Sequence, residues 1–162
     1  MSNVGRHSMN SNRGSASLTF QPLTVLPVTL QAGYLAAAQA LMPGVELLAT
    51  GSPAEARALT LVSAHVLECL LKAYLTAALG TDTELKKLNV RHNLVALWQE
   101  AASRGLSISA TAPSWVAIVG ALHGSPYHLR YQAGVHGMQL PATQPMVSEI
   151  SALLAAVRPH VR

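Results

Sequence analysis

The sequence has few of the residues that mark secreted, metal-rich or highly charged small proteins. Of its 162 residues, one is cysteine, one is aspartate, 4% are aromatic and 11% are charged. A lone cysteine, Cys69, closes no intrachain disulfide and excludes a zinc module with four cysteine ligands, which fits a reducing compartment. Because half of the residues are hydrophobic, the chain is not intrinsically disordered. Alanine and leucine supply most of the apolar volume, which predicts an all-α fold.

The formal net charge of +4 does not predict a duplex-binding surface. Four of the arginines lie near the two ends of the chain, at Arg6, Arg13, Arg158 and Arg162. Without them, basic and acidic side chains are equal in number, so the body of the protein lacks the broad basic stripe that DNA-binding domains present to phosphates.

No membrane-spanning or export segment is predicted. Residues 1–17 are polar and rich in Ser, Asn and Gly, which predicts a disordered tail. The uncharged stretch that follows is interrupted by Pro22, Pro27 and Pro43 before an apolar run of membrane-spanning length is reached. We therefore expect a cytoplasmic protein without a membrane partner, whose high hydropathy reflects a compact core and the interface of a homo-oligomer.

Residues 18–162 are predicted to form one domain of about five helices with a long central helix. Ser52, Pro53 and Glu55 form a capping-box pattern at the start of that long helix, and Gly80 ends it. An irregular segment rich in proline and glycine, residues 123–145, precedes the last helix. The expected elements are an extended arm over 18–29 and helices over about 30–41 (ended by Pro43 and Gly44), 53–79, 94–104, 114–122 and 144–157, with a short turn of helix in 81–90.

Two pairs on the long helix have the i, i+4 spacing that brings side chains together. Glu68 and Lys72 are expected to form an ion pair, partly buried, that organises the core. His65 and Cys69 have metal-ligand types, but two ligands are too few for a metal site, so core packing is the preferred interpretation. We expect no cofactor and no metal.

Three histidines make the irregular segment the most chemically suggestive part of the chain. His123, His128 and His136 lie close to Tyr127, Arg130 and Tyr131. Histidine exchanges protons near neutral pH, and arginine binds phosphate through two hydrogen bonds. The sequence has no glycine-rich phosphate loop, no nucleophile elbow and no HExxH motif. With Asp82 as its one aspartate, it also lacks a plausible acid for Ser/His/Asp chemistry.

The order of short motifs over residues 54–136 resembles the HEPN superfamily of small prokaryotic helical proteins. The motifs are Glu68-Cys69-Leu70-Leu71-Lys72-Ala73-Tyr74-Leu75, then Gly80, Lys86 and Lys87, then His92-Asn93-Leu94 with Leu97, Gly105-Leu106, and Leu129-Arg130-Tyr131. The resemblance implies an up-and-down helical bundle that forms a homodimer. It also implies an association with RNA or a nucleotide, without a cofactor, and an antitoxin or nucleotidyltransferase partner.

Many HEPN-like proteins are metal-independent ribonucleases of toxin–antitoxin or other defence systems, and their active site pairs an arginine with a later histidine, with four to six residues between the two. Arg130 and His136 match this spacing. The resemblance implies that His136 is the general acid/base and that Arg130 stabilises the charge that develops on the phosphate. Binding or supporting roles are expected for Glu68, Lys72, His92, Asn93, His128 and Tyr131.

Two departures from the family pattern leave an alternative open. Tyr131 follows Arg130 where active members usually have a polar residue, and Gly134 and Gly137 predict a loop where the motif is normally helical. A loop loses much of the advantage of a fixed arrangement of catalytic groups. The alternative is a non-catalytic module for dimerisation or protein interaction, in which Arg130 pairs with a carboxylate such as Glu68 or Glu149.

Overall fold

The computed structural model describes residues 29–88, 90, 92–131 and 137–161, and all regular secondary structure in these residues is helical. The all-α prediction is confirmed. The expected disordered tail and nearly all of the extended arm lie outside the described residues. The α-helices are α1 (Leu30–Ala49), α2 (Ala56–Leu79), α3 (Asp82–Lys87), α4 (Leu94–Ser103), α5 (Ser114–His123) and α6 (Thr143–Val157), with 3₁₀ turns at Pro53–Glu55 and Arg158–His160.

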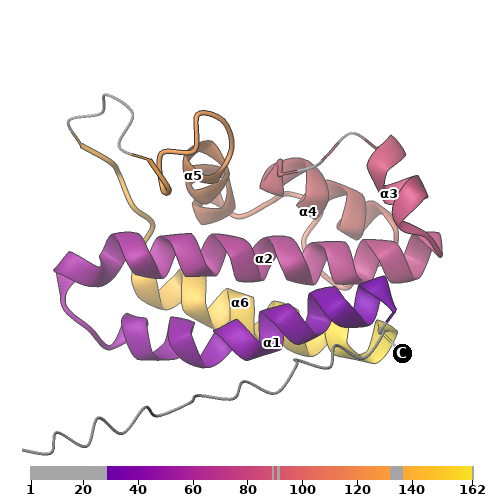
Figure 1. Ribbon diagram of the computed structural model, residues 1–162, viewed down its shortest axis with the longest axis horizontal. Coiled ribbons are helices and arrows are strands. Elements are labelled where there is room, and N and C mark those ends of the chain that lie inside the picture. Colours follow the sequence, from indigo (N-terminus) through magenta and orange to yellow (C-terminus); the bar gives the residue numbers. More distant parts are fainter. Residues whose placement is uncertain (1–28, 89, 91, 132–136, 162) are drawn as a thin grey trace, which may run out of the picture.

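The long helix α2 lies at the centre of the fold, as its sequence predicts. Helices α1 and α6 run beside it on one side, and the shorter helices α4 and α5 lie on the other, with α3 near the C-terminal end of α2 (Figure 1). Elements from both halves of the chain therefore meet at the middle of α2.

The ends of α2 follow the predicted capping signals. The amide nitrogen of Ser52 donates to Oε2 of Glu55 at 2.7 Å, and the chain enters the helix through the 3₁₀ turn that begins at Pro53. At the other end Gly80 has φ +79°, a left-handed conformation that glycine adopts without steric cost.

Helix α1 corrects the expectation that Pro43 and Gly44 end the first helix near Leu41. The helix continues to Ala49 with Pro43 inside it. A proline in a helix interior removes a main-chain hydrogen bond and costs about 3 kcal/mol. Met42 and Val45, on either side of it, are both buried in the core, and this burial offsets the cost. Tertiary packing thus overrides the local signal.

The shorter helices begin and end close to the predicted residues. The side chain of Thr81 caps α3, and Oδ1 of Asn93 accepts from the amide of Ala96 at 3.0 Å to cap α4. The described residues contain six α-helices and not about five, because the short turn expected in residues 81–90 is the complete helix α3.

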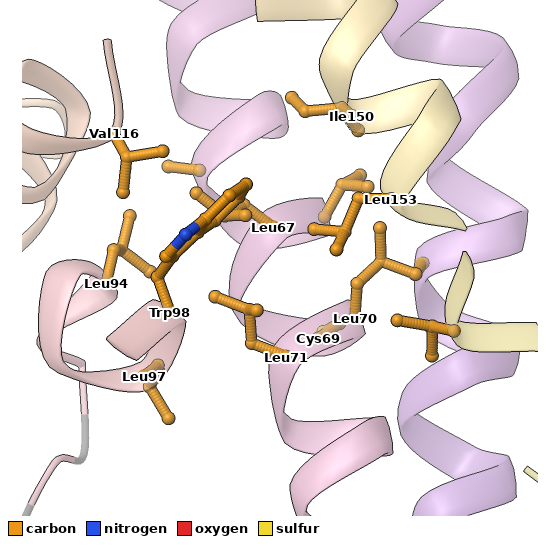
Figure 2. Close-up of a cluster of buried hydrophobic side chains, with 14 of the residues drawn as sticks. Leu67, Cys69, Leu70, Leu71, Leu94, Leu97, Trp98, Val116, Ile150 and Leu153 are labelled. Atoms are coloured by element: carbon orange, nitrogen blue, oxygen red, sulfur yellow. The ribbon is translucent and has the colours of Figure 1, made fainter. Parts of the chain in front are cut away.

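One core connects the two sides of α2 (Figure 2). Leu67, Leu70 and Leu71 are fully buried on α2, and Trp98 of α4 packs beside them. The indole nitrogen of Trp98 donates to the carbonyl of Ser109 at 2.8 Å, so the ring is buried without an unpaired polar atom. This packing fixes α4, and with it the turn that precedes α4, against the middle of α2.

The stretch Pro53–Leu79 is, among the described residues, the one helix long and apolar enough to cross a membrane. In the fold, 72% of the most apolar 18-residue stretch of this helix is buried inside the protein. Core helices of soluble proteins pass the same test of length and composition, so the test by itself does not identify a membrane-spanning segment.

Candidate functional site

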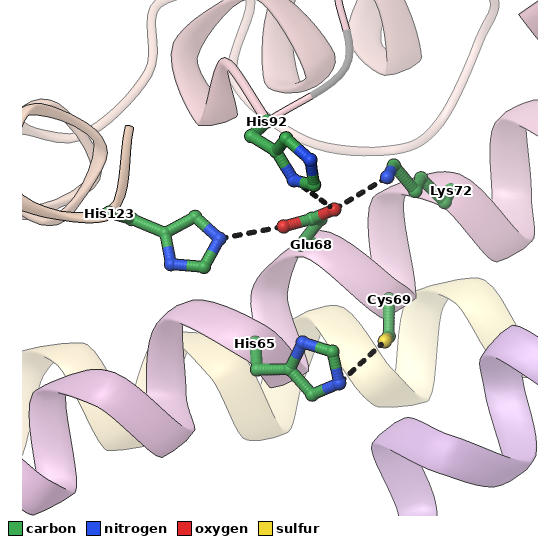
Figure 3. A network of polar contacts seen from close by, with 6 residues as sticks. All are labelled: His65, Glu68, Cys69, Lys72, His92 and His123. Carbon is green, nitrogen blue, oxygen red and sulfur yellow. Dashed lines mark hydrogen bonds and ion pairs between the residues drawn. The ribbon is translucent and has the colours of Figure 1, made fainter. Parts of the chain in front are cut away.

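A buried carboxylate at the middle of α2 is the centre of the polar site. Glu68 is 5% exposed and contacts three nitrogen-bearing side chains (Figure 3). Its Oε1 lies 2.5 Å from Nζ of Lys72 and 2.9 Å from Nδ1 of His92, and its Oε2 lies 2.7 Å from Nε2 of His123. We call Glu68, Lys72, His92 and His123 the Glu68 cluster.

Three separate elements bring the cluster together. Lys72 lies one helical turn after Glu68 on α2, so the predicted ion pair is confirmed. His92 lies in the turn before α4, next to the capping residue Asn93, and His123 is the last residue of α5. The cluster therefore depends on α4 and α5 packing against the same side of α2.

The Glu68 carboxylate is held in its charged form. Burial by itself would raise the pKa of Glu68, because it disfavours the ionised carboxylate. The hydrogen bonds with His123, Lys72 and His92, together with the charge of Lys72, outweigh burial and hold the pKa of Glu68 well below its ordinary value. An ionised Glu68 can only accept, so the contacting nitrogen of each imidazole carries a proton.

His92 connects this buried charge to solvent. Its side chain is 46% exposed, and it lines an open cleft of about 470 Å³ together with Asn93, Ser125 and Tyr127. A carboxylate that accepts from Nδ1 orients the ring and favours the tautomer in which Nε2 is free to exchange protons. The His92–Glu68 pair thus has the form of an oriented acid–base group beside a cleft.

His123 occupies the opposite environment. It is 1% exposed, and its ring meets the His92 ring edge-on, with centroids 6.1 Å apart. Only Nε2 has a partner, Glu68; Nδ1 is buried and has no hydrogen-bond partner among the described residues. A buried polar atom without a partner costs free energy, so this nitrogen requires an explanation.

The cluster also has metal-ligand residue types. Ligand atoms of Glu68, His92 and His123 all lie within 4.8 Å of one another. However, one nitrogen of each imidazole makes its hydrogen bond directly to an oxygen of Glu68, and the ammonium of Lys72 would repel a cation at the same carboxylate. The geometry therefore fits a hydrogen-bonded cluster better than a metal centre.

The side chains of His65 and Cys69 are in contact, as their i, i+4 spacing predicts. Sγ of Cys69 lies 3.8 Å from Nε2 of His65. Burial, followed by the nearby charge of Glu68, raises the pKa of Cys69 to about 11. The thiol is consequently protonated at neutral pH and is a poor nucleophile.

The segment after α5 is irregular, and hydrogen bonds hold it against α5 and α2. The amide of Leu129 donates to the carbonyl of Leu122 at 3.2 Å, and the guanidinium of Arg57 on α2 donates to the carbonyl of His128 at 3.0 Å.

Tyr127 has φ +64°, and it is the one described residue other than glycine in the left-handed region. Such strain persists where surrounding contacts enforce it, and it is common at binding sites. We call residues 124–131 the α5 loop.

Arg130 projects from the α5 loop and makes none of the ion pairs considered above. Glu68 is occupied by its own cluster, and Glu149 accepts from the indole nitrogen of Trp115 at 2.8 Å. The guanidinium carbon of Arg130 instead lies 5.6 Å from the centroid of the Tyr127 ring. Among the described residues, no carboxylate neutralises Arg130.

The structure therefore brings together only part of the predicted site. Glu68, Lys72 and His92 are in contact, with Asn93 next to them, whereas His128, Arg130 and Tyr131 lie on the α5 loop and do not contact Glu68. His136 lies outside the described residues. His123 is the site residue that the sequence did not predict. In the sequence it lies nearest to His128 and His136. No spacing rule relates it to Glu68, which lies 55 residues earlier.

Comparisons with protein-family models, with curated proteins and with solved structures find no match for this chain. The resemblance to HEPN proteins therefore depends on the sequence motifs named above.

Proposed function

We propose that this protein is a HEPN-like domain that binds RNA and cleaves it without a metal ion. The observation that carries the proposal is the exposed guanidinium of Arg130, which has no carboxylate partner among the described residues and lies against Tyr127. Tyr127 lines the same cleft as His92 and Asn93. A cation for phosphate beside an aromatic ring for base stacking is the combination that single-stranded nucleic acids require.

In the proposed reaction the 2′-oxygen of a ribose attacks the adjacent phosphorus, and the bond to the 5′-oxygen of the next nucleotide breaks. His136 removes the proton from the 2′-hydroxyl, and a proton is returned to the leaving 5′-oxygen. Arg130 binds the phosphate oxygens on which negative charge increases. The products are a 2′,3′-cyclic phosphate and a 5′-hydroxyl end.

The motif resemblance supports a biological setting for this activity. We place the protein in the cytoplasm of a prokaryote, as the toxin of a toxin–antitoxin or defence system, with an antitoxin or nucleotidyltransferase as its partner. Homodimerisation belongs to this proposal, because HEPN-like active sites combine Arg/His pairs from two protomers.

The test is an incubation of purified protein with a labelled single-stranded RNA in EDTA. We expect cyclic-phosphate products from the wild type and a loss of about 100-fold or more in rate for Arg130→Ala and for His136→Ala. Arg104→Ala is the matched control, because Arg104 is a surface arginine paired with Glu100 on α4. Cleavage that survives in both test variants removes Arg130 and His136 from the mechanism.

A second candidate function is a non-catalytic dimerisation module. An exposed hydrophobic side chain on α1 favours it. Leu47 on α1 is 73% exposed, the most exposed large hydrophobic side chain among the described residues. RNA binding without any cleavage by the wild type would favour this function. A dimer seen by light scattering that becomes monomeric in Leu47→Asp would locate the interface on α1.

A further inference from the structure

The proposed cleavage of RNA needs a second group that transfers a proton. The attacking 2′-oxygen and the leaving 5′-oxygen lie roughly in line on opposite sides of the phosphorus atom. While His136 removes the proton from the 2′-hydroxyl, a different group therefore has to return a proton to the 5′-oxygen. Such a group must be accessible to the substrate and held in one orientation.

His92 has both properties. Its side chain is 46% exposed and lines the cleft of about 470 Å³. Its Nδ1 is fixed 2.9 Å from Oε1 of the buried Glu68, whereas Figure 3 marks no contact at its other ring nitrogen. With Nδ1 held at the carboxylate, Nε2 is the ring nitrogen that remains for a substrate in the cleft.

His123 contacts the same carboxylate but lacks access to a substrate. It is 1% exposed and does not line the cleft. Of the two histidines that contact Glu68, only His92 can therefore meet a ligand.

Tyr127 connects His92 with the arginine that binds phosphate in the proposed reaction. Its ring lines the same cleft as His92, and the guanidinium carbon of Arg130 lies 5.6 Å from the centroid of this ring. A phosphate bound by Arg130 would therefore lie next to the cleft. The volume of the cleft lies within the 300–1,000 Å³ that is typical of small-molecule sites, so one nucleotide has room there.

We propose that His92 is the general acid of the cleavage reaction and that the cleft binds the nucleotide on the 3′ side of the scissile phosphate; this inference rests on the proposed function. Nε2 of the protonated ring gives its proton to the 5′-oxygen as the bond between phosphorus and that oxygen breaks, and the electron pair of the bond stays on the oxygen. Glu68 is a positioning residue, because it accepts from Nδ1 and stabilises the imidazolium. Water returns the proton to Nε2 after the reaction.

The test compares two RNA substrates that differ in one atom. In the second substrate sulfur replaces the leaving 5′-oxygen, and a thiolate leaves without a proton because it is far more stable than an alkoxide near neutral pH. We expect His92→Ala to cleave ordinary RNA about 100-fold more slowly than the wild type. The same variant should cleave the sulfur substrate less than about tenfold more slowly, since the missing proton is not needed there.

Two further variants serve as comparisons. Arg130→Ala should lose rate on both substrates, because the phosphate carries the same charge in each. His160→Ala should cleave both like the wild type, since His160 is an exposed histidine that packs on Tyr74 and does not line the cleft. The ratio of the two rates of one variant does not depend on the fraction that is folded, so a loss of stability in His92→Ala does not imitate the expected result.

A separate variant examines the nucleotide in the cleft. Ala121 is an exposed residue of α5 that lines the cleft, so Ala121→Trp fills the cleft from the surface. It should weaken binding of an RNA with a 2′-deoxy nucleotide at the cleavage position, which cannot be cleaved, at least about tenfold in fluorescence anisotropy. Ala155→Trp is the matched control, because Ala155 is exposed on α6, on the other side of α2.

The outcomes separate this proposal from the proposed function. The role of His92 is overturned if His92→Ala cleaves RNA like the wild type, or if it loses the same factor on both substrates. Normal RNA binding by folded Ala121→Trp overturns the nucleotide site. In these cases the wild type still cleaves RNA, so the proposed function remains. A wild type that cleaves neither substrate overturns the proposed function and, with it, the role of His92.

Discussion

The Glu68 cluster and the α5 loop contain similar side chains and use them in opposite ways. In the cluster, both oxygens of one buried carboxylate have partners, supplied by α2, α4 and α5. On the loop, Arg130 has an aromatic neighbour and no carboxylate, and Tyr127 is held in a strained backbone conformation. From this difference we expect that removing a partner from the cluster lowers stability, whereas Arg130 on the loop has no carboxylate partner to lose.

The largest expected effect comes from removing the charge at the centre of the cluster. Glu68→Gln leaves buried cationic and polar partners without their acceptor, so we expect a loss of about 3 kcal/mol in the free energy of unfolding. Urea denaturation measures this loss. Glu100→Gln is the control, because Glu100 pairs with Arg104 at the surface, where such pairs contribute about 0–1 kcal/mol. Equal effects of the two variants would contradict a stabilising cluster.

The contribution of the Glu68 cluster to the free energy of unfolding should decrease as the pH is lowered. The pKa of Glu68 is held below its ordinary value in the folded protein, so its contribution is complete above the unfolded-state pKa and is lost as pH falls toward the folded-state pKa. The loss begins below about pH 5 and is about 1.4 kcal/mol per pH unit. Urea denaturation at pH 7, 5, 4 and 3 should show the gap between wild type and Glu68→Gln becoming smaller. A constant gap would show that Glu68 has an ordinary pKa.

The connection between the loop and α2 should have an intermediate effect. Arg57→Ala removes the hydrogen bond to the carbonyl of His128, and a hydrogen bond from a charged donor contributes about 1.5–3 kcal/mol. We expect faster amide hydrogen exchange at Leu129 and Arg130, whose amides bond within this region. Arg104→Ala should leave these amides unchanged. Unchanged exchange in Arg57→Ala would show that the loop is fixed by other contacts.

The smallest effect should come from releasing strain in the loop. Glycine tolerates the positive φ of Tyr127, so Tyr127→Gly should raise stability by about 0.5–1 kcal/mol in thermal unfolding. The same variant should weaken RNA binding in fluorescence anisotropy, because the stacking ring is lost. Tyr131→Gly is the control without positive φ and should lower stability. If Tyr127→Gly is also destabilised, packing of the ring outweighs the strain.

Local chemistry made much of the fold predictable. The capping pattern at Ser52–Glu55, the stop at Gly80 and the cap at Asn93 each operate within a few residues, and the structure has all three. The prediction that Pro43 ends the first helix is wrong because it considered only local chemistry. Proline does disfavour a helix interior, but the burial of Met42 and Val45 against the rest of the fold outweighs that local preference. The predicted Glu68–Lys72 pair succeeded because both residues lie on one helix.

The sequence by itself determined the helical class, most helix boundaries and the i, i+4 contacts, because these depend on interactions over a single turn of chain. Only the tertiary structure decided that His92 and His123 share one carboxylate and that Arg130 is left without a carboxylate partner among the described residues. Those outcomes depend on how α4 and α5 pack against α2, and such packing is set by shape and burial summed over the whole core.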